Sequence, residues 1–323
     1  MTPPPKSDET SGGELSPSLK RILDAAVEIK AEPDATEMAF MARALVQATL
    51  PHSDPGEVPI WGRTNGRLTL TIKPDWELDP KTNQARSSGI PYGTIPRLLL
   101  FWITTEAVKT KSRRLELGNS LSAFMRELGL QPTGGRWGSI PRLREHMKRL
   151  FRAKISFDVH QEADGNLGQA WLDMQVAPKG ELWWSHHQPD QASLWKSWIE
   201  LGDSFFEAIC SAPVPVDMRA LRVLKNSPMA LDLYAWLNYR SFTLERQGRE
   251  QFVPWRGLAQ QLGSDYSDIK DFRKNVKPAI RKIHAVMPGL NIEFADGGLI
   301  LYPGKPAISP KRVRQKLSTK EPV

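Results

Sequence analysis

The chain of 323 residues contains a single cysteine, Cys210, and no long apolar run. One thiol cannot form an internal disulfide or a cysteine-based zinc site, and such a composition is typical of a reducing compartment. No stretch approaches the roughly 18 apolar residues of a membrane span, and residues 1–18 lack the apolar segment of a secretion signal. We therefore expect a soluble cytoplasmic protein that does not bind membranes.

Motifs of catalytic and metal sites are also scarce. The glycine-rich stretch from Gly134 to Ser139 lacks the lysine of a phosphate-binding loop. His186 and His187 are adjacent and would point to opposite faces of a strand, and the other histidines are isolated. We expect no catalytic residues, no metal and no cofactor, and hence no enzyme. An origin-nicking or priming enzyme is a weaker alternative, which only this histidine pair and scattered carboxylates favour.

Basic side chains outnumber acidic ones by 44 to 36, and the excess is uneven along the chain. Residues 1–60 hold five basic and ten acidic side chains, so the rest of the chain holds 39 basic and 26 acidic ones. A body with this excess of positive charge favours a polyanionic partner, although charge alone does not name it.

The length exceeds what one hydrophobic core usually serves, so we expect about two domains. The N-terminus is rich in Pro, Ser, Gly and acids, which predicts disorder, and apolar residues then recur at helical spacing up to residue 50. The predicted organisation is a disordered tail (1–17), a helical N-terminal arm (18–60), a first winged-helix domain (61–205), a second winged-helix domain (206–305) and a basic C-terminal tail (306–323).

The first predicted domain contains a helix that is apolar nearly all round, which is typical of a buried core helix. Gly129 can end a later helix, and Pro141 fits only the first turn of the one that follows. The predicted order is a strand at 67–72, the core helix at 95–108, a strand at 114–117, helices at 119–128 and 139–152, and a hairpin of strands 154–160 and 169–176.

A similar order follows the segment 211–216, which we interpret as broken by its prolines. Pro278 should make the last helix kink or restart near residues 276–277. The predicted elements are helices at 218–224 and 228–239, a strand at 251–253, helices at 254–262 and 267–283, and a hairpin of strands 291–295 and 299–302. Because the same order of helices and strands occurs twice, the sequence predicts an α+β fold of two tandem winged-helix domains, with an N-terminal helical arm and disordered termini.

The helices at 139–152 and 267–283 each divide into an apolar and a basic face. A helix that enters the major groove needs this division, because one face holds it on its domain while the other donates to phosphates and base edges. The predicted inward residues are Ile140, Leu143, Met147 and Leu150, and then Ile269, Phe272, Val276, Ile280 and Ile283. The candidate DNA-binding residues are Arg136, Ser139, Arg142, Arg144, Lys148, Arg149, Arg152, Ser267, Lys270, Arg273, Lys274, Lys277 and Arg281.

Four other segments are weaker candidates for nucleic-acid contact. The hairpin tips at 161–168 and 296–298 contain acids, which argue against strong phosphate binding. The tryptophans between residues 183 and 198 could stack on single-stranded bases, but we interpret them as core or interface residues. The basic segment 305–316 is a secondary candidate for contact with a DNA backbone.

Five blocks follow one another in the chain: Asn65–Ile72, Ile90–Leu100, Thr105–Arg114, Leu117–Leu121 and Gly134–Ser139. Their succession, within a match over roughly residues 60–305, resembles the RepA family of plasmid replication initiators. The resemblance implies a protein that binds repeated double-stranded DNA sites (iterons) at a plasmid origin, opens an adjacent AT-rich region and recruits host DnaA and the replicative helicase.

The same resemblance implies paired winged-helix domains and a monomer–dimer equilibrium, in which dimers repress the initiator's own promoter and so take part in plasmid copy control. By position, the helices at 139–152 and 267–283 would be the recognition helices, and Pro278 resembles a proline that interrupts the latter in related initiators. The N-terminal arm lies outside the match. A winged-helix transcriptional repressor is the alternative that the sequence leaves open.

Overall fold

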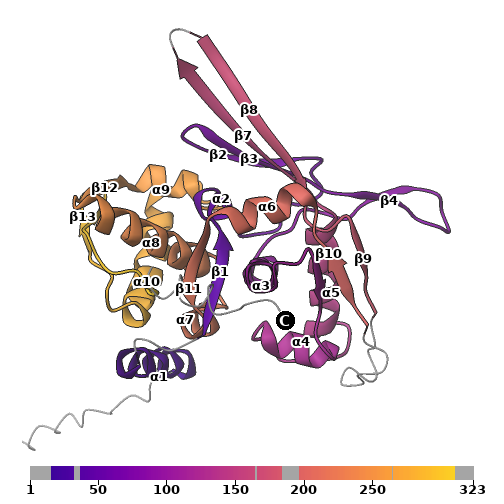
Figure 1. The fold of residues 1–323 in the computed structure, drawn as a ribbon, viewed down its shortest axis with the longest axis horizontal. Helices are drawn as coiled ribbons and strands as arrows, with labels where there is room; N and C mark the ends of the chain where they lie inside the picture. The colour runs from indigo at the N-terminus through magenta and orange to yellow at the C-terminus, as the bar shows by residue number, and fades with distance from the viewer. Residues whose placement is uncertain (1–15, 33–36, 164–165, 184–195, 264, 310–323) are drawn as a thin grey trace, which may run out of the picture.

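The computed structural model describes residues 16–32, 37–163, 166–183, 196–263 and 265–309. Helices and short antiparallel sheets are mixed along this part of the chain, so the predicted α+β class is confirmed (Figure 1). The segment predicted to be a disordered tail lies outside the described residues except for its last two, and the basic C-terminal tail is described only as far as residue 309. None of the described helices combines the length and apolarity needed to cross a membrane.

Helix α1 (Pro17–Ala31) opens the arm and packs against the body of the protein. Ser16 caps it, because its hydroxyl accepts a hydrogen bond from the Leu19 N–H at 3.3 Å. The helix contacts α7 (Met218–Leu224) and α10 (Ile269–Val286), which lie far away in the sequence. Its buried residues are Ile22, Ala25 and Ile29.

The predicted helix between residues 38 and 46 is wrong over its first half. Strand β1 (Met38–Ala42) comes first, and the short helix α2 (Arg43–Gln47) follows directly. All five residues of β1 are buried. A strand buried on both faces shows no alternation of apolar and polar residues, so the spacing of its two methionines matched a helix equally well.

Strand β1 pairs antiparallel with β11 (Pro213–Asp217), which lies in the segment interpreted above as broken by its prolines. That interpretation is wrong, because the prolines stand at alternate positions of an ordered strand. Pro213 and Pro215 cannot donate hydrogen bonds, so their peptide groups must face away from β1. Val214 and Val216 then supply the donors toward β1, and both side chains are buried.

The end of the arm presses against the chain that follows α9 (Trp255–Gln261). The Gly263 N–H donates to the Thr49 hydroxyl at 2.6 Å, and the His52 N–H donates to the Gly263 carbonyl at 2.7 Å. A Cβ at Gly263 would collide with the Leu50 carbonyl, so only glycine permits this approach. The arm is therefore built into the second half of the molecule.

Residues 61–200 form three sheets beside three helices (Figure 1). The helices are α3 (Thr94–Thr110), α4 (Leu121–Glu127) and α5 (Ser139–Arg152). The strands are β2 (Trp61–Asn65), β3 (Leu68–Lys73), β4 (Trp76–Leu78), β5 (Ala85–Ser87), β6 (Arg114–Glu116), β7 (Lys154–Ala163), β8 (Asn166–Gln175), β9 (Lys179–Glu181) and β10 (Trp198–Glu200).

The predicted hairpin after α5 is confirmed as β7 and β8, but it is longer than expected. Pairing continues to Ala163 and Asn166, so strands occupy most of the predicted polar tip. The hairpin extends the sheet β2-β3-β7-β8 and projects from the body in Figure 1. Strand β6 does not pair with this hairpin but with β10, in a separate sheet of order β6-β10-β9.

The described part of residues 203–301 carries helices, strand β11 and a small sheet of strands β12, β13 and β14. Helix α8 runs to Gln247, eight residues beyond the predicted end, and the boundary expected between residues 205 and 206 falls inside α6. Strand β14 lies between β12 and β13. The elements not yet introduced are α6 (Asp203–Ser211), α8 (Pro228–Gln247), β12 (Gln251–Pro254), β13 (Ile292–Ala295) and β14 (Gly298–Leu301).

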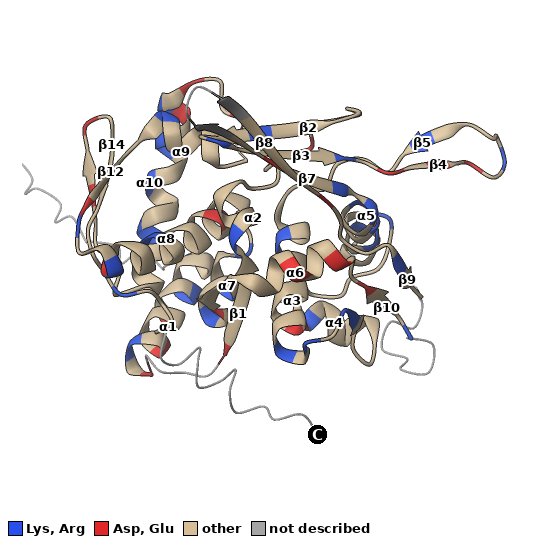
Figure 2. Ribbon diagram, turned by 45° about the horizontal axis from the view of Figure 1, so that its top comes forward, with Lys and Arg blue, Asp and Glu red and all other residues tan. Residues whose placement is uncertain are grey.

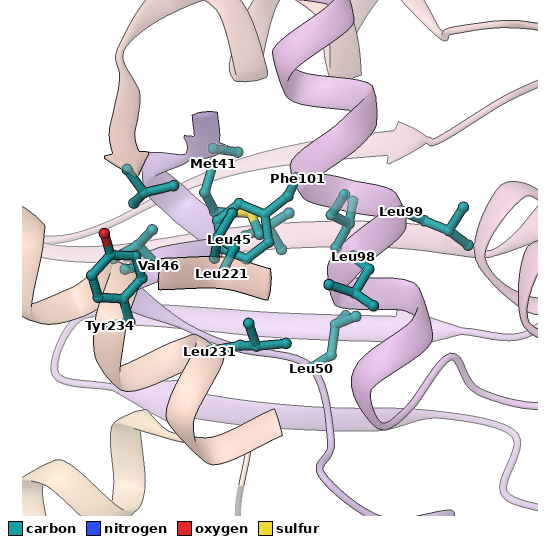
Figure 3. Close-up of a cluster of buried hydrophobic side chains, with 14 of the residues drawn as sticks. Met41, Leu45, Val46, Leu50, Leu98, Leu99, Phe101, Leu221, Leu231 and Tyr234 are labelled. Atoms are coloured by element: carbon teal, nitrogen blue, oxygen red, sulfur yellow. The ribbon is translucent and has the colours of Figure 1, made fainter. Parts of the chain in front are cut away.

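The two predicted domains share one continuous hydrophobic cluster. The core helix α3 was expected to be buried nearly all round, and it is: Ile95 through Thr105 are buried without interruption. Figure 3 shows side chains of the arm, α3, α7 and α8 meeting in one place. The arm therefore supplies apolar residues that join α3 to the second half, and no gap in the core marks a domain boundary.

A buried ion pair joins the same two halves. Arg97 on α3 is 2% exposed, and its Nε and Nη2 donate to Asp232 on α8 at 2.7 and 2.8 Å. The remaining guanidinium donors bond the carbonyls of Leu50, Pro51 and Gly93. Burial alone would raise the pKa of Asp232, but the Arg97 charge and the hydrogen bond from His52 hold it below its usual value. The carboxylate thus stays charged and fully bonded.

We expect Asp232→Asn to lower the free energy of unfolding by about 3–5 kcal/mol, because it leaves the buried Arg97 charge without a counter-charge. Urea unfolding followed by tryptophan fluorescence measures this. Asp75→Asn is the matched control, since Asp75 pairs with Arg152, whose side chain is half exposed, and such pairs contribute about 0–1 kcal/mol. Equal losses of unfolding free energy in the two variants would contradict the interpretation that the buried pair of Arg97 and Asp232 is the more costly one to break.

Candidate nucleic-acid interface

Helix α5 holds its apolar face against the core as its sequence pattern predicts. Ile140, Leu143, Met147 and Leu150 are all buried, so the inward face is confirmed. His146 is buried as well, although the spacing of apolar residues in the sequence did not predict it. The basic side chains are therefore left on the outer side of the helix, where Lys and Arg are blue in Figure 2.

The candidate residues at the start of α5 remain available to a partner. Arg142 and Arg144 are exposed, and Arg136 lies on the exposed turn before the helix. Among the described residues, no carboxylate forms an ion pair with any of these three. Ser139 has a different role: its N–H donates to the Thr133 hydroxyl at 2.9 Å, and its own hydroxyl accepts from the Thr133 N–H at 2.9 Å. It shapes the turn.

The candidate residues at the end of α5 meet acids from elsewhere in the chain. Lys148 contacts Glu77, and Arg152 Nε lies 2.5 Å from Asp75 Oδ2. Glu77 belongs to β4 and Asp75 directly precedes it, so the β4–β5 hairpin supplies both carboxylates. The chain around β4 is acidic, but no feature of the sequence indicates which helix it faces.

Arg149 is neutralised in a similar way. Its Nε lies 3.1 Å from Glu145 Oε1, one turn earlier on the helix, and its Nη1 lies 3.5 Å from Asp54 Oδ2. Its guanidinium also lies over the Tyr92 ring, 5.2 Å from the centroid. Three of the basic residues predicted to bind DNA on α5 therefore already have acidic partners within the protein.

Helix α10 begins two residues later than predicted. Ser267 lies outside it and is exposed, while Asp268 is the N-cap, its carboxylate accepting from the Lys270 N–H at 2.7 Å. The helix continues from Ile269 to Val286 with Pro278 inside it, so of the two predicted alternatives the restart is wrong, and the kink stays a prediction. Pro278 is exposed, which keeps its ring away from the packed face. Of the predicted inward residues, all but the half-buried Ile269 are buried.

The five basic candidates on α10 differ from those at the end of α5. Lys270, Lys274 and Arg281 are exposed, whereas Arg273 lies over the Trp255 ring at 5.8 Å and Lys277 over the Phe294 ring at 5.4 Å. Within the described part of the chain, none of the five forms an ion pair with a carboxylate. The basic residues of this helix, which are blue along the ribbon of α10 in Figure 2, are therefore not paired with acids of the described chain.

No three His, Cys, Asp or Glu side chains of the described residues lie together so that they could hold a metal ion. His52 bonds Asp232, and His284 bonds the Leu290 carbonyl, so each has a structural partner. The pair His186 and His187, on which the nuclease alternative depends, lies outside the described residues.

Residues 90–256 match the family model described as plasmid-encoded RepA protein, which is more than half of the chain. The chain belongs to this family of replication initiators. The matched part of the RepA-family chain includes α3, α4, α5 and α8, whereas α10 lies beyond it. No curated protein sequence matches the chain.

Two solved structures resemble the fold of this RepA-family chain. A selenomethionine derivative of domains 2 and 3 of RctB has 12% sequence identity and a TM-score of 0.49, covering 80% of this chain and 95% of that one. A second structure of RctB domains 2–3 has 10% identity and a TM-score of 0.47, covering 80% of this chain and 94% of that one.

One titratable group on α5 should affect stability as the pH changes. Burial and the neighbouring Arg149 and Arg142 charges lower the pKa of His146 from 6.5 to about 4. The unfolded chain therefore takes up a proton at His146 at a higher pH than the folded chain does. The stability that this group contributes is present above pH 6.5 and is lost as the pH falls toward 4.

Between pH 7 and pH 5, we expect His146→Gln to lose about 2 kcal/mol less stability than the wild type, since one pKa unit corresponds to about 1.4 kcal/mol. Urea unfolding at the two pH values measures both losses. The comparison within each protein cancels any effect of the substitution itself at neutral pH. Identical losses in both proteins would show that His146 is protonated equally in the folded and unfolded chains.

Proposed function

We propose that this RepA-family chain is a non-enzymatic initiator that binds repeated double-stranded DNA sites at a plasmid origin, with α5 and α10 as its two recognition helices. The observation that supports this most directly is the outward charge of α10. Five basic side chains share one helix whose other face is packed into the core, and no described acid pairs with them. Phosphates and base edges in a major groove are suitable partners for such a surface.

The order of elements around α10 supports a winged-helix unit. A helix (α8), a strand (β12), two helices (α9 and α10) and a hairpin (β13 and β14) follow one another, and β14 pairs with β12. In such a unit the second helix of the pair would be the recognition helix, and the hairpin would be its wing. The first unit has the same order of elements, but its strand β6 pairs with β10 instead of the hairpin.

We infer that the two helices contribute differently. The N-terminal half of α5 would contact DNA through Arg142 and Arg144, with Arg136 from the preceding turn. The C-terminal half holds the β4–β5 hairpin through Lys148 and Arg152. Opening of an AT-rich region, recruitment of host DnaA and the replicative helicase, and repression by a dimer remain part of the proposal through the family.

Selection of bound fragments from random double-stranded DNA tests the proposal. We expect a short sequence to be enriched, and footprinting on that sequence to show two protected major-groove segments about one helical turn apart per monomer. Enrichment of no sequence, with uniform protection along the DNA, would contradict it. If the enriched site occurs only in promoters and not at the plasmid's origin, the protein is a repressor instead.

We expect the triple variant Lys270→Gln, Lys274→Gln and Arg281→Gln to make DNA binding less dependent on salt. Each lost phosphate contact lowers the slope of log affinity against log salt concentration by about 1, so the slope should fall by about 3. Fluorescence anisotropy of a labelled duplex between low and moderate salt measures it.

The control is the double variant Lys148→Gln and Arg152→Gln, which removes basic residues that already have acidic partners. Its slope should change by less than about 1. A larger loss in this control than in the α10 triple variant would assign the main DNA contact to α5.

A further inference from the structure

A hollow of about 520 Å³ opens beside the start of α5. Its walls come from five parts of the chain: the end of the arm, the loop before α3 with the first turn of that helix, the turn before α5, α5 itself, and the start of α8. Five of the lining residues are basic or aromatic and lie around the start of α5: Tyr92, Arg136, Trp137, Arg142 and His146. The proposed function uses Arg136 and Arg142 for contact with DNA, but it gives no role to the aromatic side chains of Tyr92 and Trp137.

Trp137 is 84% exposed, which is unusual for so large an apolar side chain. The guanidinium of Arg136 lies 5.2 Å from the centre of its ring. The turn that carries both residues is held by the paired hydrogen bonds between Thr133 and Ser139. Gly138 lies so close to the carbonyls of residues 133 and 134 that it has no room for a side chain. A tightly built turn therefore presents this ring to solvent.

His146 forms part of the wall, and its ring meets the Tyr92 ring edge-on with centroids 5.1 Å apart. The side chain is 8% exposed, yet its Nδ1 has no hydrogen-bond partner among the described residues. Nδ1 itself is fully buried, so the hollow meets the imidazole at other atoms of its ring. The low pKa of about 4 keeps the imidazole neutral, so that it offers hydrogen bonding without charge.

The charges around the hollow favour an anionic ligand. Neither Arg136 nor Arg142 has an ion-pair partner among the described acids. Glu145 also lines the hollow, but its carboxylate pairs with Arg149 at 3.1 Å, and Asp54 lies 3.5 Å from the same arginine. A ligand that suits the site carries negative charge beside a flat ring.

We propose that this hollow binds one nucleotide of an unpaired DNA strand, with the base stacked on Trp137 and the phosphates near Arg136 and Arg142. An unpaired base can leave the stack and lie against an aromatic side chain, whereas a paired base cannot. The proposal rests on the DNA-binding function and extends it to strands that separate beside the recognition helix.

Titration of the full-length protein with oligothymidylate of about 15 nucleotides tests this. We expect the oligonucleotide to quench tryptophan fluorescence in the wild type and in Trp171→Phe, but much less in Trp137→Phe. Trp171 is a matched control because it is 70% exposed and lies on β8, away from the hollow. Equal quenching in both variants would overturn the proposal.

Binding of labelled oligothymidylate to Trp137→Ala, followed by anisotropy, gives a second measurement. Stacking of a base on an aromatic ring contributes about 1–3 kcal/mol, so affinity should fall roughly 5-fold to 150-fold, while affinity for a duplex stays nearly unchanged. Equal weakening for both forms of DNA, or no binding of oligothymidylate by the wild type, would overturn the proposal. In the latter case the hollow is free to serve a protein partner.

The triple α10 variant separates this proposal from the proposed function. It should lose affinity for duplex DNA and still show quenching by oligothymidylate. If the wild type binds no duplex selectively but Trp137 still responds to the single strand, the initiator proposal fails and the nucleotide site stands. If duplex binding is selective and Trp137 does not respond, only the nucleotide site fails.

Discussion

The relative placement of the two halves depends on the ion pair between Arg97 and Asp232. Helix α3 carries the arginine and packs against α5, while α8 carries the aspartate and packs against α10. The pair therefore links the supports of both candidate recognition helices. Because the charges are buried and every guanidinium nitrogen has an acceptor, the two helices are held in one geometry.

The arm strengthens this connection from a second direction. Its strand β1 pairs with β11, and the carbonyls of Leu50 and Pro51 accept hydrogen bonds from Arg97. The segment that precedes the family match thus contributes both backbone pairing and apolar side chains to the joint between the halves. For the proposed function, a fixed distance between α5 and α10 would suit recognition of two adjacent grooves, because rigid placement lowers the entropy cost of ordering the helices on the DNA.

Tertiary contacts also divide basic residues that look alike in the sequence. Lys148 and Arg152 on α5 have the same charge and the same four-residue spacing as Lys270 and Lys274 on α10. Among the described residues, only the first two pair with acids, which come from β4 and the residue before it. The proposed DNA contacts therefore lie on α10 and at the start of α5, whereas the basic residues at the end of α5 already have acidic partners within the protein. In the same region, a rigid turn leaves Trp137 uncovered beside an unbonded buried histidine.

The sequence alone determined those features that depend on local periodicity: the buried helix α3, the inward faces of α5 and α10, and the two hairpins. Each follows from apolar residues repeating within a few positions. Only the tertiary structure decided that residues 38–42 and 213–217 pair as strands, that Arg97 meets Asp232, and that Asp75 and Glu77 cover part of α5. These contacts join residues about 70 to 180 positions apart, and no local repeat carries information about which distant partner a side chain will meet.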